Sequence, residues 1–326
     1  MTETLVAVKD LVKHFPVRRS LVAKLTVGAK DQIVQAVNGV NFDIHRQETL
    51  GLVGESGCGK TTLGRTLVGL YEPTAGSVTF AGQDVIKLKK ANPLAFYRQV
   101  QMVFQNPYAS LNPRKTVREI LSQSLRARAR YNPKELEEAI GRLLEQVGLS
   151  VHQIDRYPHQ FSGGQRQRVS IARALAMKPS FIVCDEPVSA LDVSVQAQIL
   201  NLLQDLQLRF ELTYLFISHD LSVVRYLCDR VAVMYLGKIV ELGATEDVFN
   251  RPVHPYTEAL LSSMPQIKRD PNQRRILLQG TVPSPLNPPS GCGFHPRCFA
   301  KVGKICEEEA PKLISCGSEH FAACHR

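Results

Sequence analysis

Short apolar runs and longer amphipathic segments alternate along the first 250 residues. Residues 5–53 alternate apolar stretches with turn residues and predict antiparallel strands. Further strands are predicted at Glu48–Gly54, Gln99–Phe104, Phe181–Cys184, Leu215–Ile217 and Val231–Met234. Helices are predicted at Lys60–Leu70, at Gly163–Met177 and along the apolar positions Val195, Ile199, Leu202, Leu203 and Leu206. This alternation predicts an α/β fold with a parallel core sheet that Val231–Met234 completes.

Residues 106–160 have a different character. A loop-like stretch, NPYASLNPR, is followed by two predicted helices, Thr116–Arg128 and Pro133–Val147. In the second helix the apolar residues fall on one face, at Leu136, Ile140, Leu143, Leu144 and Val147. We therefore expect a helical subdomain, at about 106–162, inserted into the α/β core.

Two other stretches depart from the core pattern. Val17–Val34 is basic and irregular and is predicted to be a loop. After Asn250 prolines become dense, which predicts a linker into a small, loop-rich domain. The expected domains are 1–250 and 251–326, in keeping with a length of 326 residues.

Composition and charge exclude few classes of function, but the pattern of apolar residues argues against a membrane-spanning segment. No stretch approaches the roughly 20 apolar residues that cross a bilayer, and MTETLVAVKD does not resemble a signal peptide. We expect a cytosolic chain whose membrane role, if any, comes through a partner. The net charge of +10 fits a solvated basic surface, or a face toward anionic lipid or nucleic acid. Trp is absent and no basic run has interleaved aromatics, which disfavours nucleic acid.

GESGCGKT, at Gly54–Thr61, follows an apolar strand and opens a helix. Glycines in such a loop let backbone N–H groups converge on phosphate oxygens, and the helix N-terminus adds its positive dipole end. Lys60 reaches the β and γ phosphates, and Thr61 is placed to ligate Mg²⁺. Cys58 is expected to be a small filler and not a reactive thiol. The predicted nucleotide contacts are Gly54, Glu55, Ser56, Gly57, Cys58, Gly59, Lys60, Thr61 and Thr62.

Asp185 and Glu186 end the apolar strand Phe181–Cys184. Asp185 is expected to serve Mg²⁺, directly or through a water. Glu186 is expected to orient and deprotonate the water that attacks the γ-phosphate. The alternative is that these are surface acids at a strand end.

FSGGQ, at Phe161–Gln165, predicts a second anion site. The Ser162 hydroxyl and the N–H groups of Gly163 and Gly164 would lie at a helix start, with Gln165 beside them. A chain with two phosphate-binding signals suggests a nucleotide clamped between two subunits.

Together, GESGCGKT (the P-loop, Gly54–Thr61), SGGQ followed by QRQRVSIARAL, and FIVCDE resemble the ATPase of ABC systems. The resemblance implies a RecA-like parallel-sheet core with an antiparallel β subdomain, the inserted helical subdomain and a small Cys/Pro-rich C-terminal extension. It also implies that SGGQ of one subunit covers the γ-phosphate held by the P-loop of the other. All core motifs are intact, so a hydrolysing site is expected.

The same resemblance extends to four further positions. Gln105 in VFQNP resembles the Q-loop, which contacts Mg²⁺ and senses the membrane partner, and Asp192 in SALD resembles the D-loop at the dimer interface. His219 in FISHD resembles the switch histidine on the γ-phosphate; the alternative is a core or capping histidine. Phe15 in KHFPV resembles the aromatic residue that stacks on adenine; the alternative is a core residue.

A second resemblance covers the C-terminal part. RPVHPYTEALLSSMP and GTVPSPLNPPSGCGFHPRC resemble the extension of dipeptide and oligopeptide importer ATPases, a group that includes nickel importers. The chain is most similar to the F-type subunit of the dipeptide system. This implies a heterodimer with a D-type ATPase, two permease chains, an extracytoplasmic solute-binding protein, and a place at the cytoplasmic face of the inner membrane.

Five of the eight cysteines lie in the last 35 residues. Cys292, Cys298, Cys306 and Cys324 have the spacing C-x5-C-x7-C-x17-C, which is not that of a zinc ribbon. Four thiolates on such loops suit a 4Fe–4S cluster or zinc. The resemblance implies the 4Fe–4S cluster, with zinc and free thiols as alternatives. Cys316 is spare by position, and His295 and His325 are substitute ligands or surface residues.

The leading hypothesis is an importer ATPase for di- or oligopeptides. ATP binding closes the dimer, hydrolysis reopens it, and the motion reaches the permeases through Gln105–Val117. Glu186, His219 and Gln105 are the expected catalytic residues, and Thr61, Gln105 and Asp185 the expected Mg²⁺ ligands. The alternatives are a nickel or other small-solute importer, an exporter, and a soluble ABC ATPase acting on nucleic acid or ribosomes. A soluble ABC ATPase of that kind usually carries two cassettes or long coiled-coil insertions, and this chain has neither.

Overall fold

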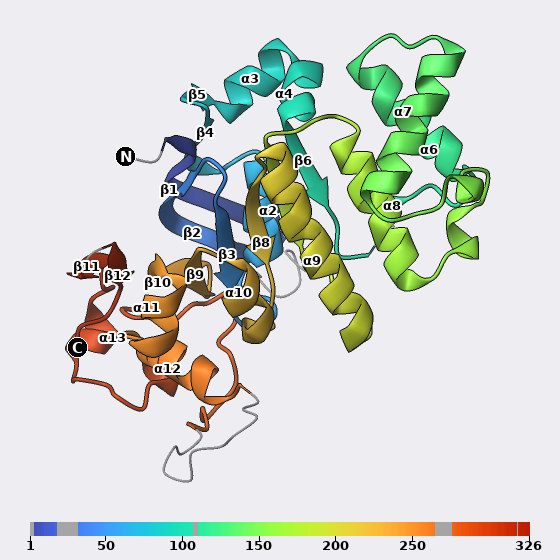
Figure 1. The fold of residues 1–326 in the computed structure, drawn as a ribbon. Coiled ribbons are helices and arrows are strands. Elements are labelled where there is room, and N and C mark those ends of the chain that lie inside the picture. The colour runs from blue at the N-terminus through green and yellow to red at the C-terminus, as the bar shows by residue number, and fades with distance from the viewer. Residues whose placement is uncertain (1–2, 18–31, 107–109, 265–275, 318) are drawn as a thin grey trace, which may run out of the picture.

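The computed structural model describes residues 3–17, 32–106, 110–264, 276–317 and 319–326. Most of the predicted basic loop at Val17–Val34 therefore lies outside the described residues. The expected α/β architecture is confirmed: two sheets and the helices around them form the main body (Figure 1). None of the helices in the described part of the chain combines the length and hydropathy needed to span a bilayer.

The larger sheet contains the predicted parallel core. Its strand order is β11-β12-β10-β9-β3-β8-β7-β6. The parallel strands are β3 (Thr49–Val53), β6 (Val100–Val103), β7 (Phe181–Asp185), β8 (Thr213–Ile217) and β9 (Arg230–Tyr235). Every residue of β3, β7 and β8 is buried, as expected where helices cover both faces of a parallel sheet.

The parallel part of the sheet is completed by β9, as predicted, but the sheet continues beyond it with antiparallel strands that were not predicted. The β9 strand turns through Leu236 and Gly237, both at positive φ, into the antiparallel strand β10 (Lys238–Ala244). Two short C-terminal strands, β12 (His320–Ala322) and β11 (Ile314–Gly317), continue the sheet beyond β10. The prediction missed β12 because its pairing with β10 joins positions about 80 apart, and it missed β11 because that strand is four residues long and exposed throughout.

The smaller sheet is antiparallel, as predicted for the first residues. Its order is β2-β1-β4-β5, formed by Gln32–His45, Thr4–Val17, Ala75–Phe80 and Gln83–Asp84. Its apolar face packs with α2 (Lys60–Leu67) in one hydrophobic cluster that includes Leu11, Val40 and Leu63. The α2 helix stops at Leu67 and not at Leu70, because Gly69 has φ +70° and cannot continue a right-handed helix.

The inserted helical subdomain is confirmed as α6 (Val117–Arg128) and α7 (Pro133–Gln146), which lie beside α8 (Gly163–Leu175) on one side of the molecule (Figure 1). Capping boxes begin both α6 and α7: Thr116 with Glu119, and Asn132 with Glu135. The predicted apolar face of α7 is buried, at Leu136, Ile140, Leu143, Leu144 and Val147.

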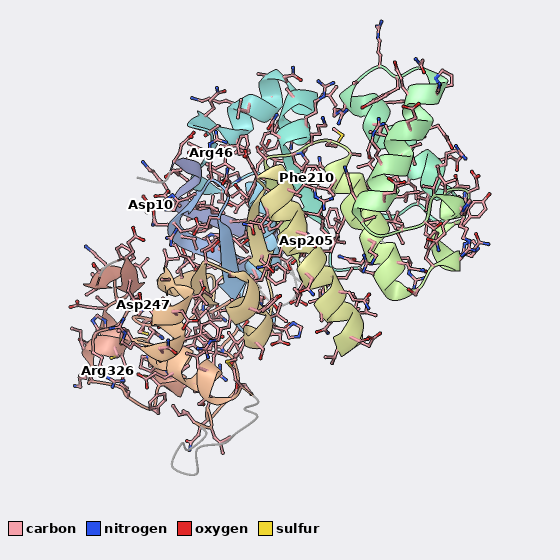
Figure 2. All side chains as sticks on the ribbon, viewed as in Figure 1. Asp10, Arg46, Asp205, Phe210, Asp247 and Arg326 are labelled. Atoms are coloured by element: carbon pink, nitrogen blue, oxygen red, sulfur yellow. The ribbon has the colours of Figure 1, made fainter. Side chains whose placement is uncertain are left out.

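The remaining helices complete the cover of the sheets. They are α3 (Val85–Ala91), α4 (Pro93–Gln99), α9 (Val193–Phe210), α10 (Leu221–Leu227), α11 (Thr245–Asn250), α12 (Pro255–Ser262) and α13 (Ile305–Glu308), with 3-10 turns at Val151–Gln153, Pro158–Gln160 and His295–Arg297. The C-terminal elements, with Asp247 and Arg326, lie on the side opposite the helical subdomain (Figure 2).

A buried carboxylate joins the C-terminal residues to the core sheet. Glu241 on β10 has no exposed surface, and its oxygens accept the N–H groups of Val253 and His254, each at 2.9 Å. The ring Nε2 of His320 on β12 lies 2.8 Å from Glu241 Oε1. One side chain thus fixes both the start of the C-terminal segment and its last strand.

We expect Glu241→Ala to lower the free energy of unfolding by about 3–5 kcal/mol, because buried donors lose their acceptor. Urea denaturation measures this. Glu258→Ala is the control: Glu258 pairs with the half-exposed Arg326 at the surface, so its loss should cost at most about 1 kcal/mol. Equal urea midpoints for the two variants would contradict the role of Glu241.

Candidate functional site

The loop between β3 and α2 has a backbone that only glycine permits at three positions. Gly54, Gly57 and Gly59 have φ of +153°, +80° and +110°. A Cβ on Gly54 would lie 2.2 Å from the carbonyl oxygen of Met234, and one on Gly59 would lie 2.0 Å from that of Ala36. The loop is therefore pressed against β9 and β2, and its shape leaves no room for a side chain there.

Lys60 opens α2 and turns its ammonium back into this loop. The residue is 5% exposed. Its Nζ donates to the carbonyl oxygens of Gly54 at 2.7 Å and of Glu55 at 3.0 Å. Its further partner is Cys58 Sγ at 3.9 Å, and a buried ammonium with such neutral partners is suited to receive an anion at the helix N-terminus.

Thr61 and Asp185 meet although 124 positions separate them. Thr61 Oγ1 donates to Asp185 Oδ1 at 3.0 Å. Asp185 is 1% exposed; burial raises the pKa of its carboxyl, and the Thr61 hydrogen bond opposes that rise. A hydroxyl and a carboxylate beside a phosphate-binding loop fit Mg²⁺, which takes its other ligands from phosphate and water.

Glu186 is the centre of a polar triad. Its Oε2 accepts a hydrogen bond from Gln105 Nε2 at 2.7 Å and lies 3.3 Å from His219 Nδ1. The backbone of Glu186 has φ +45°, which a non-glycine residue adopts only at a cost. Its N–H donates to the carbonyl of Ile217 at 3.0 Å, which fixes the turn after β7 against the end of β8.

One cavity of about 690 Å³ brings ten of the predicted site residues together. The predicted residues that line it are Phe15, Ser56, Gly57, Gly59, Lys60, Thr61, Thr62, Gln105, Glu186 and His219. The Phe15 ring stands at its rim, edge-on to Tyr71 with centroids 5.3 Å apart and with Lys13 Nζ 4.9 Å from its centroid.

Val34, Ala36 and Pro285 also line the cavity and were not predicted. The carbonyl of Pro285 accepts the N–H of Gln35 at 3.0 Å, so a C-terminal segment forms part of the wall. No local sequence signal marks such a contact, because it joins strand β2 to a proline-rich loop 250 positions away.

Three predicted loop residues, Gly54, Glu55 and Cys58, are absent from the described lining of the cavity. The N–H of Glu55 donates to the Tyr256 hydroxyl at 2.8 Å, and its carboxylate pairs with Arg297. Cys58 is 3% exposed and burial raises the pKa of its thiol, in keeping with a filler.

The SGGQ residues form a separate, capped helix start. Ser162 is exposed, its Oγ accepts the N–H of Gln165, and Gln165 Oε1 accepts the N–H of Ser162 at 3.1 Å. Gly164 lies against α9, where a Cβ would be 2.3 Å from Val195 Cγ1. None of Ser162, Gly163, Gly164 and Gln165 is among the described residues that line the cavity.

Asp192 is also exposed and begins α9. Its Oδ1 accepts the N–H of Val195 at 3.0 Å and the hydroxyl of Ser194 at 2.8 Å, and these hydrogen bonds lower the pKa of the carboxyl. The chain therefore presents two capped helix starts, Ser162 and Asp192, at its surface.

The four predicted cysteine ligands are neighbours in the C-terminal part. Burial raises the pKa of the Cys292 thiol, and the nearby Cys324, Cys298 and Cys306 raise it further. Within the described ranges, however, no three cysteine, histidine or acidic side chains are close enough to hold a metal ion. Cys316 is exposed, and the rings of His295 and His325 are bonded to backbone carbonyls.

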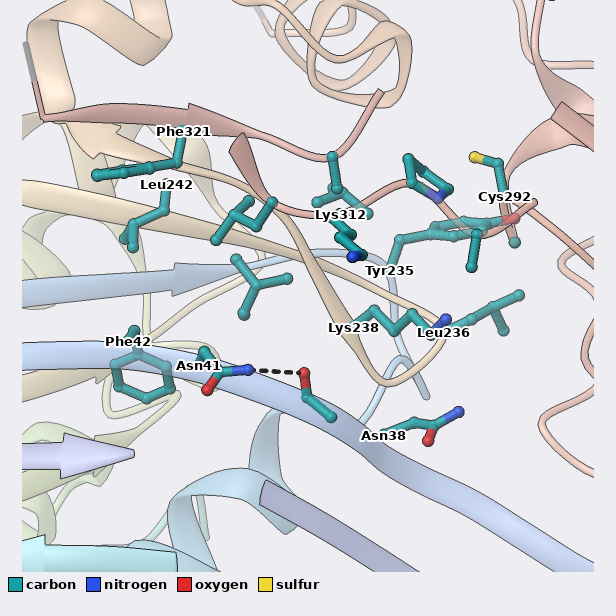
Figure 3. A pocket seen from close by; sticks show the side chains of 18 of the residues that line it. Asn38, Asn41, Phe42, Tyr235, Leu236, Lys238, Leu242, Cys292, Lys312 and Phe321 are labelled. Atoms are coloured by element: carbon teal, nitrogen blue, oxygen red, sulfur yellow. Dashed lines mark hydrogen bonds between the residues drawn. The ribbon is translucent and has the colours of Figure 1, made fainter. Parts of the chain in front are cut away.

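A larger cavity, of about 1070 Å³, lies between the small sheet, the β9–β10 hairpin and the C-terminal residues (Figure 3). Tyr235, Leu236, Lys238 and Lys312 gather around it, with Cys292 at one side (Figure 3). The described lining contains no P-loop residue, so this cavity is distinct from the one that holds Lys60 and Glu186.

Two family models match the chain. Residues 37–189 match the model described as "ABC transporter", and residues 240–306 match "Oligopeptide/dipeptide transporter, C-terminal region". The first match spans the loop with Lys60, the SGGQ helix start and the strand that ends at Asp185. The second spans Glu241, Tyr256 and Arg297.

Among solved structures, the chain is similar to two ATP-binding cassettes. One is the cassette MJ0796, solved as a dimer in a post-hydrolysis state with ADP and Pi, at a TM-score of 0.65 and 27% identity over 74% of this chain and 99% of that one. The other is cbiO1 of Clostridium perfringens, part of the complex cbiONQ, at a TM-score of 0.63 and 26% identity over 76% and 92%.

Curated relatives match over nearly the full length. The oligopeptide transport ATP-binding protein AppF of Bacillus subtilis (strain 168) is 51% identical over 99% of this chain and 97% of its own. The dipeptide transport ATP-binding protein DppF of Haemophilus influenzae is 48% identical over 96% and 94%. Together with the two matching models, these relatives show that the chain belongs to the ABC-transporter ATP-binding proteins that carry the oligopeptide/dipeptide transporter C-terminal region.

Proposed function

We propose that this ABC ATPase energises the uptake of di- or oligopeptides by an importer. The observation that carries the proposal is the cavity lined by Lys60, Thr61 and the Glu186 triad; Asp185 is not in the described lining but is bonded to Thr61. The names of its relatives and its C-terminal region favour peptides over nickel, other small solutes or nucleic acid. Which peptides are taken up would be decided by other components of the importer.

In this proposal the nucleotide occupies the cavity with its base on Phe15. The P-loop N–H groups and Lys60 hold its phosphates, and the ammonium exchanges the carbonyls of Gly54 and Glu55 for phosphate oxygens. Thr61, Asp185 and the amide oxygen of Gln105 would hold Mg²⁺, which neutralises charge between the β and γ phosphates. The hydrogen bond from Gln105 Nε2 to Glu186 leaves that amide oxygen as the atom for the ion.

Glu186 is proposed as the general base. Its carboxylate orients the attacking water and accepts its proton, and Gln105 and His219 hold the carboxylate in position through the contacts at 2.7 and 3.3 Å. His219 is 59% exposed in this chain, so its outer edge is free to meet the γ-phosphate. Closure of the site around the phosphates would change the surroundings of this histidine most.

The SGGQ residues and Asp192 are proposed to act on a second subunit. Ser162 and Asp192 are exposed, the SGGQ residues and Asp192 lie outside the described lining of this chain's cavity, and the similar cassette MJ0796 forms a dimer. Ser162, Gly163, Gly164 and Gln165 would cover the γ-phosphate bound by the partner, with Asp192 at the contact. We propose a related D-type ATPase as that partner, so that each chain contributes to two sites.

The assembly is proposed to include two permease chains and an extracytoplasmic solute-binding protein. The ATPase would bind the permeases at the cytoplasmic face of the inner membrane, through the region that begins at Gln105. Dimer closure on ATP and reopening after hydrolysis would pass to the permeases there.

Cys292, Cys298, Cys306 and Cys324 are proposed to hold a 4Fe–4S cluster. The four thiols are neighbours, and a four-iron cluster accepts thiolates that stand further apart than the four ligands of one zinc ion. The cluster would tie together a C-terminal part that has few regular elements.

Glu186→Gln is expected to reduce ATP turnover by about 10²–10⁴ while ATP still binds, because the amide keeps the shape but cannot take the proton. Steady-state hydrolysis by the assembled transporter and equilibrium ATP binding measure the two effects. Glu246→Gln, at an exposed ion pair with Arg225, is the matched control and should leave both unchanged. Near-normal hydrolysis by Glu186→Gln would remove Glu186 from the role of base.

Phe15→Ala is expected to weaken ATP binding about two- to tenfold with little change in turnover at saturation, because a ring contact is lost that does not take part in the reaction. Phe15→Tyr should restore the affinity, since it keeps an aromatic face. If Phe15→Ala bound ATP as tightly as the unaltered protein, the adenine would not rest on this ring.

Cys298→Ser is expected to remove the cluster, measured as iron and acid-labile sulfide in protein purified without oxygen. The unaltered protein should then be brown, with four irons per chain. Cys316→Ser, at the exposed spare cysteine, should keep both colour and iron. Colourless unaltered protein with one zinc per chain would overturn the cluster assignment.

A further inference from the structure

Two side chains of the C-terminal region, Arg297 and Tyr256, form hydrogen bonds with one residue of the P-loop, Glu55. Arg297 donates from its two terminal nitrogens to the two carboxylate oxygens of Glu55, at 2.8 and 3.2 Å. The Tyr256 hydroxyl accepts the backbone N–H of the same glutamate at 2.8 Å. Glu55 is thus held from its backbone and from its side chain by residues about 200 and 240 positions away.

Packing holds both Tyr256 and Arg297 in place. Tyr256 has no exposed surface, and its ring lies 4.6 Å from that of Tyr235 and 5.4 Å from that of Phe294, measured between centroids. The Arg297 side chain is 8% exposed and also approaches the Tyr235 hydroxyl at 3.4 Å. Phe294, three residues before Arg297, is 1% exposed, so the segment that carries the guanidinium is anchored in the core.

Glu55 in turn contacts the Lys60 ammonium through its backbone carbonyl. The Glu55 carbonyl accepts the Lys60 ammonium at 3.0 Å, so a shift of the Glu55 peptide would move one of the two acceptors that hold this charge. The bidentate pair with Arg297 fixes the plane of the Glu55 side chain, and the Tyr256 bond fixes the preceding peptide.

The ion pair between Arg297 and Glu55 also changes the net charge near the P-loop. Glu55 is a carboxylate in a loop that must receive a triphosphate, and it is 23% exposed. Without Arg297 its negative charge would be unpaired beside the phosphates and would oppose their binding. Arg297 is therefore placed both to hold the loop and to cancel the one acidic charge within it.

We propose that the C-terminal region forms part of the ATP site itself: Arg297 and Tyr256 are positioning residues that hold Glu55 and set the affinity for ATP. The inference depends on the proposed binding of ATP by this loop. Neither residue is in the described lining of the cavity, so both would act on the binding step through Glu55 and not on the proton transfer at Glu186.

The test compares ATP affinity and turnover in the assembled transporter. Arg297→Ala is expected to weaken ATP binding about tenfold and to raise KM by a similar factor, with kcat little changed. Arg251→Ala is the control: it breaks a surface ion pair with Asp247, at a side chain that is 80% exposed, and should bind ATP normally.

A second substitution separates the charge effect from simple damage to the fold. Adding Glu55→Gln to Arg297→Ala removes the unpaired carboxylate and should recover most of the lost affinity. Weak binding without such recovery, or normal binding by Arg297→Ala alone, would overturn the proposal. If the unaltered transporter itself failed to bind ATP, the proposed function would fall instead.

If Arg297→Ala does not fold, Tyr256→Phe tests the proposal in its place. It keeps the aromatic packing and removes only the hydroxyl that accepts the Glu55 N–H. ATP binding should weaken about two- to tenfold, the usual loss for one hydrogen bond. An unchanged dissociation constant for ATP would overturn the role of this contact.

Discussion

The buried ammonium of Lys60 is the constraint on which the rest of the site depends. A charged side chain that is 5% exposed has to be surrounded by oxygens, and here the loop's own carbonyls at Gly54 and Glu55 supply them. Those carbonyls point inward only because Gly54 and Gly59 take backbone angles closed to other residues. The loop is held in that shape by β2 and β9 on one side and by C-terminal side chains on the other.

Strand register explains why the remaining chemistry collects beside this lysine. In the parallel sheet Leu52 pairs with Ile217, and Ile217 pairs with Asp185, so β3, β8 and β7 end in one row. The loops that leave those ends carry Lys60, His219 and Glu186. Such a row of carboxyl ends is where α/β sheets bind their ligands. The turn at Glu186, bonded to Ile217, keeps its carboxylate in that row.

The sequence predicted what local patterns encode and missed what distant pairing decides. The parallel strands, the apolar face of α7 and the residues around the cavity each lie in a short motif or a clear period, and they were found. Strand β12 carries no such signal, because it is three residues long and its partner β10 lies about 80 positions earlier in the chain. Tyr256, Arg297 and Pro285 were missed for the same reason: one tyrosine, arginine or proline in a loop does not indicate which residue it meets.

The C-terminal region is therefore not an addition to an ATP-binding core that would be complete without it. Within the described residues, the contacts of residues 251–326 with the core include His320 with Glu241 in the sheet, Pro285 with Gln35 at the cavity wall, and Arg297 with Glu55 in the P-loop. The first contact fixes where the region lies, because a buried carboxylate with three donors tolerates no other placement. Given that placement, the other two contacts bring it to the cavity wall at Pro285 and to Glu55 in the P-loop. A cassette without this region would have to support Glu55 and close that wall by other means.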